Sequence, residues 1–201
     1  AGMHSPYGAD VSKVLESDPE ARKDKDNAAW QPQYYNSYHW GEPEMGYFLS
    51  ADPFVIRRDV SMLADAGVDV LILDVTNAVR YWDEWEALCK VLTDMKANGN
   101  KVPQICFWSF NGEAIYVVQE IYDRFYSKGK YKDLWFYWYG KPLLLYNATP
   151  ANDANGSGHK LRNYLYDANA ATNPKHPHYG DPLYTSQYLT DYPDYIKEFF
   201  T

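Results

Sequence analysis

The sequence predicts an α/β fold, and more specifically part of a (β/α)8 barrel of the TIM type. Helical and strand patterns alternate three times between residues 53 and 146. Each strand pattern is a nearly continuous apolar run, as in parallel strands that are buried on both faces. The three strands end in "DVTNA", "WSFNG" and "YNATP". Polar and aromatic residues at successive strand ends are typical of the active-site face of a barrel.

The first helix and strand have clear boundaries. The stretch "ADPFVIRRDVSMLADAG" offers Asp52 as the N-cap, Pro53 at the first helical position and Gly67 as the stop. The stretch "VDVLILDVTNA" follows at once and predicts a buried strand over Val68–Leu73. We expect this strand to end at Asp74.

The same unit then repeats. The stretch "DEWEALCKVLTDMKANG" predicts a second helix that stops at Gly99, and "VPQICFW" predicts a second strand that ends near Trp108. A third helix over residues 113–126 precedes a third strand over residues 143–146. Helices between successive strands imply crossover connections and a parallel sheet. The stretch "YLTDYPDYIKEFF" predicts one more helix near the end.

A doubly wound open sheet fits this alternation as well as a barrel does. The open sheet of a dinucleotide-binding protein would carry GxGxxG directly after a strand, and none of these strands is followed by it. The barrel is therefore favoured. A full barrel takes about 250 residues, whereas residues 151–188 read as a long surface excursion. We expect a single domain, 1–201, that covers the N-terminal part of a barrel, with further strands before Ala1 and after Thr201.

The composition limits the classes of partner. Nineteen Lys and Arg against 27 Asp and Glu give a net charge of −8, which argues against a nucleic-acid partner. No apolar run approaches the ~20 residues of a membrane span. Aromatic residues make up 17% of the chain, and such rings form walls on which sugars stack. Cys89 and Cys106 have no CxxC-type neighbours and are expected to be buried free thiols.

Several residues at the strand ends are candidates for a functional site. Asp74 and Glu113 are weak candidates for catalytic acids, because glycoside hydrolysis normally uses two carboxyl groups. Asp74 is also a candidate for accepting sugar hydroxyls, and its alternative role is to hold the turn after the strand. The alternative for Glu113 is a favourable position at a helix N-terminus. The further candidates for substrate binding at strand ends are Asn77, Trp108, Asn111 and Tyr146.

The loop "YHWGEPEMGYFLSADP" precedes the first helix and is rich in aromatic and acidic residues. In a barrel it would arch over the active-site face, where His39, Trp40, Glu42 and Tyr47 would border the cleft and bind substrate. The alternative is a loop that only covers the barrel end. We expect no metal and no organic cofactor, because the "HPH" histidines have no acidic or cysteine partner at ligand spacing.

The stretches "HWGEPEMGYFLSADPFVIRRDVSMLADAGVDVLILDVTN", "VPQICFW" and "WYGKPLLLYN" together resemble the glycoside hydrolase family 99-like barrels. This group includes endo-acting mannosidases and related bacterial polysaccharide-degrading proteins. The resemblance runs from about His39 to Asn147 and lies in the order and spacing of the motifs. It implies a glycosidase that acts on an oligosaccharide or polysaccharide and is secreted or periplasmic.

In that family the catalytic carboxylates lie in a stretch of the Asn-Glu-Trp type on a late strand, and this sequence contains no such triplet. The resemblance therefore implies that this chain supplies the substrate-binding half of a cleft, with the catalytic pair outside it. Two alternatives remain open. One is a non-catalytic carbohydrate-binding barrel, and the other is a metal-dependent barrel hydrolase that uses Asp74 and the histidines.

Overall fold

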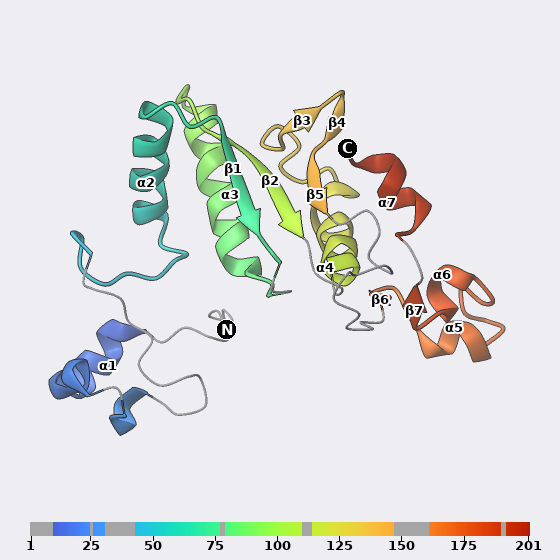
Figure 1. The fold of residues 1–201 in the computed structure, drawn as a ribbon, viewed down its shortest axis with the longest axis horizontal. Coiled ribbons are helices and arrows are strands. Elements are labelled where there is room, and N and C mark those ends of the chain that lie inside the picture. Colours follow the sequence, from blue (N-terminus) through green and yellow to red (C-terminus); the bar gives the residue numbers. More distant parts are fainter. Residues whose placement is uncertain are drawn as a thin grey trace. The chain divides into compact units, whose positions relative to one another are not determined.

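The computed structural model describes residues 10–24, 26–30, 43–76, 79–109, 114–146, 161–189 and 192–201 (Figure 1). The chain divides into two compact units. The first unit is Ala1–Asp65 with Tyr81–Lys101, and the second is Ala66–Arg80 with Val102–Thr201. Among the described residues, no helix is long and apolar enough to cross a membrane.

The first unit is helical in its described parts. Its elements are α1 (Val11–Ser17), η1 (Pro19–Lys23), η2 (Ala28–Trp30), α2 (Pro53–Asp65) and α3 (Trp82–Ala97). Trp30 closes the α1–η2 segment, because its indole Nε1–H donates to the carbonyl oxygens of Ala21 at 2.9 Å and Asp24 at 3.0 Å. The indole is buried, so the segment has a small aromatic core of its own.

Helices α2 and α3 confirm the first two predicted helices. The Asp52 carboxylate caps α2, since its Oδ1 accepts from the backbone N–H groups of Phe54 at 2.8 Å and Val55 at 3.4 Å. Gly67 and Gly99 follow the two helices with φ of +86° and +83°, a conformation in which a side chain would be strained. The two helices pack on each other and bury these residues: Val55, Ile56, Val60, Ala64, Trp85, Cys89, Val91, Leu92 and Met95.

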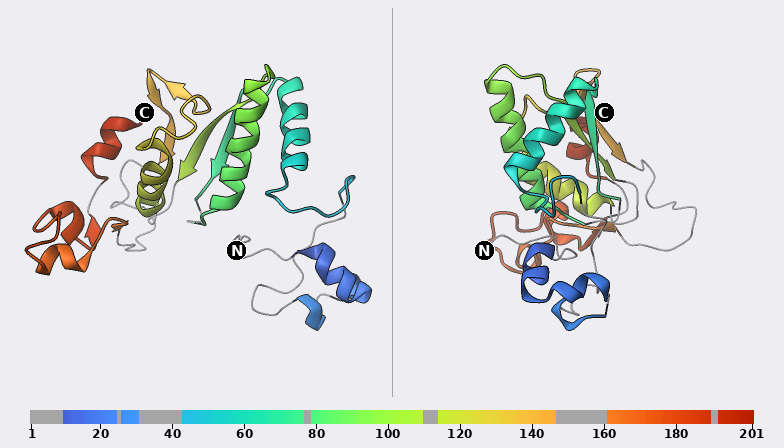
Figure 2. Two further views of the ribbon diagram at one scale, coloured as in Figure 1. Left: turned by 180° about the vertical axis from the view of Figure 1, so that it is seen from behind. Right: turned by 90° about the vertical axis from the view of Figure 1, so that its left-hand side faces the viewer.

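The second unit is built on a parallel sheet of three strands in the order β1-β2-β5. The strands are β1 (Val70–Asp74), β2 (Gln104–Ser109) and β5 (Leu144–Tyr146). Helix α4 (Ala114–Ile121), extended by the π-helical turn η4 (Tyr122–Tyr126), connects β2 to the next part of the chain and lies beside the sheet (Figure 2). The three predicted strands and the third helix are thus confirmed within one or two residues.

The prediction of a (β/α)8 barrel is wrong. In the described residues the parallel sheet has three strands and does not close on itself. Alternating helices and strands occur in open and closed sheets alike, because the same helical crossover joins neighbouring parallel strands in both. Closure depends on the number of strands and on their stagger around the axis, and neither property is recorded in a local apolar pattern.

The edge of the sheet at β5 is continued by the last residue of the chain. Thr201 N donates to the carbonyl oxygen of Pro142 at 3.0 Å, and Leu144 N donates to the carbonyl oxygen of Thr201 at 2.9 Å. This is the bonding pattern of a parallel neighbour. Helix α7 (Asp194–Phe199), which confirms the predicted last helix, carries the chain back to this edge.

The two faces of the sheet differ in burial. Alternate residues point to opposite faces, and register partners in a parallel pair share a face. Ile105, Phe107 and Leu144 lie on one face and are buried. The ring of Phe107 contacts Phe125 of η4 and Trp135, with centroids 6.5 and 6.2 Å apart, so α4 and η4 cover this face. The opposite face carries the exposed side chains of Ile72, Trp108 and Leu145 and the buried side chain of Cys106.

Two antiparallel pairs were not predicted from the sequence. One is the hairpin β3 (Tyr137–Trp138) with β4 (Lys141–Pro142), which directly precedes β5. The other is β6 (Leu161–Arg162) with β7 (Tyr188–Leu189), which brackets α5 (Ala168–Thr172) and α6 (Pro182–Thr185). The described part of the 151–188 segment therefore has secondary structure of its own.

A buried amide network fastens this segment to α4. Gln119 Nε2 donates to Asn163 Oδ1 and to the Tyr195 hydroxyl, both at 3.1 Å, and Gln119 Oε1 accepts from Tyr164 N at 3.0 Å. Asn163 Nδ2 donates to two carbonyl oxygens, at 2.5 Å and 2.9 Å, of Leu183 and Ser186. Burial raises the pKa of Tyr195 to about 12, so this phenol remains protonated.

Candidate functional site

Asp74 and Trp108 are brought together at the carboxyl ends of two neighbouring strands. They are register partners in the β1–β2 pair, so both side chains lie on the face opposite α4, on strands about 4.8 Å apart. The Trp108 ring is 42% exposed. Leu145 is the register partner of Trp108 on β5, and Ile72 lies two residues before Asp74; both are exposed apolar side chains. This surface, Ile72, Asp74, Trp108 and Leu145, is called the Trp108 face.

Asp74 is exposed, although the apolar run before it predicted a strand that is buried on both faces. The strand reads as uniformly apolar, but Asp74 lies on the face opposite α4, where the described side chains of Ile72, Trp108 and Leu145 are exposed and that of Cys106 is buried. Its Oδ1 accepts from Thr76 N at 2.8 Å, so the turn-holding role is present. A carboxylate accepts several hydrogen bonds through its two oxygens, and this bond leaves capacity for a ligand hydroxyl.

Tyr146 lies on the face opposite Trp108. Its register partner is Ser109, which is completely buried. The Tyr146 ring packs against the buried Tyr192, with the centroids 4.7 Å apart. The end of the strand at Tyr146 was predicted correctly from the sequence. The sequence did not show that Tyr146 points to the face opposite Trp108, because Leu145 is the register partner of Trp108 and the next residue points the other way.

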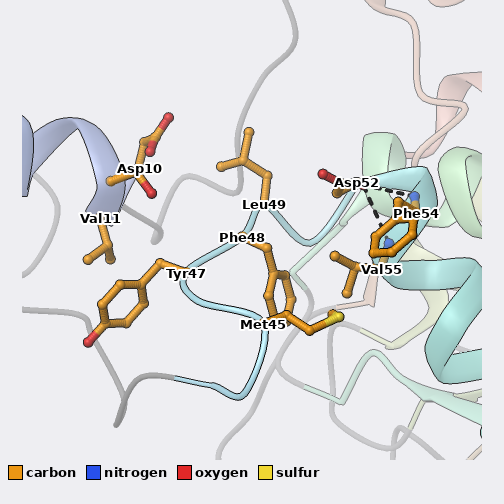
Figure 3. A pocket seen from close by; sticks show the side chains of 10 residues that line it. Asp10, Val11, Met45, Tyr47, Phe48, Leu49, Asp52, Phe54 and Val55 are labelled. Carbon is orange, nitrogen blue, oxygen red and sulfur yellow. Dashed lines mark hydrogen bonds between the residues drawn. The ribbon is translucent and has the colours of Figure 1, made fainter.

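Tyr47 belongs to the first unit and lines a pocket of about 370 Å³ (Figure 3). Three segments contribute to it: the start of α1, the loop before α2 and the start of α2. The lining residues are Asp10, Val11, Ser12, Met45, Tyr47, Phe48, Leu49, Asp52, Phe54 and Val55. The aromatic and apolar side chains dominate this list, as is common in ligand pockets.

The two carboxylates of this pocket already serve the backbone. Asp52 caps α2, as the dashed lines in Figure 3 show. Asp10 caps α1, because its Oδ1 accepts from Lys13 N at 3.3 Å, and its Oδ2 lies 3.4 Å from Lys13 Nζ. Glu44, another acid of this loop, pairs with Arg58 at 2.6 Å. The pocket therefore offers an apolar wall with acidic groups that stabilise helix starts.

A buried carboxylate that the sequence analysis did not single out lies on α4. Glu120 is 4% exposed, and its Oε2 lies 2.9 Å from Arg80 Nε in an ion pair that is not a well-aligned hydrogen bond. The Arg80 guanidinium also sits 4.8 Å above the centre of the Tyr116 ring. Burial raises the pKa of Glu120, and the positive charges of Arg80 and Arg124 act in the opposite direction.

The position of Glu120 within the third predicted helix is the sequence signal from which its burial could have been predicted. It follows Val117, Val118 and Gln119, and Ile121 comes next, so an acid stands in a turn that is apolar on most sides. A helix buried nearly all round leaves a charged residue no solvent-facing position. Such a residue requires a partner, and Arg80 at the far end of the loop after β1 supplies it.

Six of the predicted site residues lie outside the described residues. They are His39, Trp40, Glu42, Asn77, Asn111 and Glu113. Their predicted roles stay predictions.

Within the described residues, no three His, Cys, Asp or Glu side chains gather as they would around a metal ion. The "HPH" histidines instead pack within their own segment. His178 stacks on Tyr184 with the ring centroids 3.7 Å apart, and His176 Nε2 lies 3.3 Å from Asp167 Oδ2. Cys89 and Cys106 are buried free thiols, as expected.

Comparisons with family models, with curated proteins and with solved structures found no match to this chain.

Proposed function

We propose that this chain binds an oligosaccharide or polysaccharide on the Trp108 face. The observation that carries the proposal is the register pair of Trp108 and Asp74, which puts a half-exposed indole beside an exposed carboxylate on one surface. An indole face packs against the C–H face of a pyranose, and a carboxylate accepts from its hydroxyl groups. Both groups lie at the carboxyl end of a parallel sheet, where ligands of α/β proteins usually bind.

Stacking on Trp108 makes a large contribution to this binding. A ring stacked on an aromatic side chain contributes about 1–3 kcal/mol in the well-studied case of nucleic-acid bases. Since 1.4 kcal/mol corresponds to a factor of ten, Trp108→Ala weakens binding about fivefold or more. Asp74→Asn keeps an oxygen that accepts from Thr76 N but removes the charge. We expect it to weaken binding less than Trp108→Ala.

The test is isothermal titration of the protein with neutral oligosaccharides, beginning with manno-oligosaccharides because of the resemblance to endo-mannosidases. Two matched controls are Tyr179→Ala, which removes another exposed ring of the second unit, and Asp65→Asn, which removes another exposed carboxylate. Both controls should bind as the unchanged protein does. If Trp108→Ala also binds unchanged while remaining folded, the Trp108 face is not the site.

We extend the proposal to a role in glycan hydrolysis, which rests on the resemblance over residues 39–147. Asp74 and Glu120 do not form a catalytic pair across the Trp108 face, because Asp74 lies on that face and Glu120 lies on the helix that covers the other. This chain would thus contribute binding. Release of reducing sugar from a polysaccharide that the protein binds would support the hydrolase, whereas binding without release would favour a non-catalytic carbohydrate-binding protein.

A further inference from the structure

The β3–β4 hairpin exposes aromatic side chains that the proposed function does not use. Trp138 and Lys141 are register partners, as are Tyr137 and Pro142, and Tyr139 and Gly140 form the turn between them. The φ angles of the turn residues are +48° and +79°. Two central residues with positive φ are the mark of a type I′ turn, which Asn-Gly or Asp-Gly normally fills.

Tyr139 is an unusual residue for this turn. A left-handed backbone brings the Cβ of an L-residue close to the following carbonyl oxygen, so a bulky side chain is disfavoured there. The Tyr139 side chain is 89% exposed, and its ring contact is with Trp138 at 5.6 Å between centroids. Burial therefore does not compensate the strain. Such an outlier is a reason to look for a function of the ring.

The exposed rings form a corner. Trp138 is 50% exposed, and its ring stands at 75° to that of Tyr139. Tyr137, also exposed, points to the other side of the hairpin because side chains alternate along a strand. All three side chains carry a polar N–H or O–H group as well as a flat apolar face. This combination suits a hydroxylated partner better than hydrocarbon.

Positive charge is concentrated in the segment of the chain that contains this corner. Residues 128–141 contain Lys128, Lys130, Lys132 and Lys141 and a single acid, Asp133, so the segment has a net charge of 4 − 1 = +3. The whole chain has a net charge of −8. The lysine-rich stretch leads directly into the hairpin, and Lys141 stands opposite Trp138 within it. A local positive field in an acidic protein selects an anionic partner.

We propose that the hairpin binds an acidic polysaccharide, in which sugar rings pack against Trp138 and Tyr139 while Lys141 and its neighbours pair with carboxylate or sulfate groups. The surface is distinct from the Trp108 face. The hairpin precedes β5 and lies where the parallel strands begin, whereas Trp108 and Asp74 lie where they end (Figures 1 and 2). The inference is independent of the proposed function.

The test measures binding to polygalacturonate, with dextran as the neutral polysaccharide and phosphatidylserine-containing vesicles as an anionic lipid surface. Tyr139→Asn is the decisive variant, because asparagine tolerates the turn and removes the ring. We expect polygalacturonate affinity to fall at least fivefold while the thermal midpoint stays the same or rises. Trp138→Ala and Lys141→Gln should also weaken binding, and Lys175→Gln, which removes an exposed lysine elsewhere in the second unit, should not.

Affinity should also fall steeply as salt is raised, since exposed charges are screened. Equal affinity of Tyr139→Asn and the unchanged protein would overturn the proposal, as would equal binding of dextran. Binding to vesicles but not to polygalacturonate would assign the hairpin to a membrane surface instead and would also overturn it. Trp108→Ala separates the two sites, because it should lose neutral oligosaccharide binding and keep polygalacturonate binding.

Discussion

Replacement of Asn163 by alanine should strongly destabilise the second unit. The Asn163 side chain is buried and makes four hydrogen bonds: it donates to the carbonyl oxygens of Leu183 and Ser186, and it accepts from Gln119 Nε2 and Leu165 N, both at 3.1 Å. These bonds tie α4 to the segment that contains α5 and α6. Alanine would leave all four partners without the amide.

The magnitude follows from this count. A buried polar group that loses its partner costs about 1–3 kcal/mol. One of the four bonds is buried and three are part-buried, so we expect a total cost of about 2–4 kcal/mol. That is a large part of the ~5–15 kcal/mol by which a typical domain is stable. Asn163→Asp should cost at least as much at neutral pH, because the new carboxylate would face two carbonyl oxygens. Its cost should shrink at acidic pH, where the new carboxyl becomes protonated and can donate.

Urea denaturation, followed by circular dichroism, measures the free energy of unfolding. Limited proteolysis then locates the loosened region, which we expect between residues 161 and 189. Asn169→Ala is the matched control, since Asn169 is exposed on α5 and its side chain makes none of these bonds. A loss below about 1 kcal/mol for Asn163→Ala, comparable to the control, would refute the reasoning that the amide network anchors this segment.

Three further predictions concern other buried groups. Burial raises the pKa of Glu120 above its ordinary value of 4.5, so the folded protein holds this proton more tightly than the unfolded chain does. The stability that the bound proton contributes is complete below the unfolded pKa and is lost as pH rises through the folded pKa. The free energy of unfolding of the unchanged protein should therefore fall relative to that of Glu120→Gln as pH rises above 4.5. Parallel curves would contradict this. Burial raises the pKa of Cys89 to about 12 and also raises the pKa of Cys106. Alkylation of either thiol by iodoacetamide at pH 8 should therefore require opening of the structure. Labelling of the folded protein within minutes, located by mass spectrometry, would be inconsistent with this prediction. Trp30→Phe removes the indole N–H that donates to two carbonyl oxygens, and it should lower the unfolding free energy of the α1–η2 segment by about 1–2 kcal/mol. Hydrogen exchange measures this change. Unchanged protection of the segment from exchange would disprove the role of that donor.

The helices and strands between residues 53 and 146 could be predicted because their causes are local. Asp52 accepts from the first N–H groups of α2, and Gly67 and Gly99 take up positive φ at the ends of two helices. The apolar runs of β1 and β2 match the strands almost residue for residue. Each of these signals acts within a few positions of the chain, so periodicity and capping rules recover them.

The composition of the hairpin β3–β4 prevented its prediction from the sequence. Its strands are two residues long and lie within a run of aromatic residues that resembles core, and its turn uses Tyr139 instead of the usual Asn or Asp. The amide network was hidden for a different reason. Gln119 and Asn163 are 44 positions apart, and neither belongs to a recognisable motif.

The sequence by itself determined which segments are helices and strands, that the principal strands run parallel, and that Asp74 and Trp108 stand at strand ends. Only the tertiary structure decided that the described sheet stays open, that Trp108 and Asp74 are exposed on one face while Tyr146 turns to the face that α4 and η4 cover, and that Glu120 is buried beside Arg80. The physical reason is the separation along the chain over which each interaction acts. Capping and apolar periodicity act between near neighbours, whereas register, sheet closure and the burial of a charge depend on which distant segments meet.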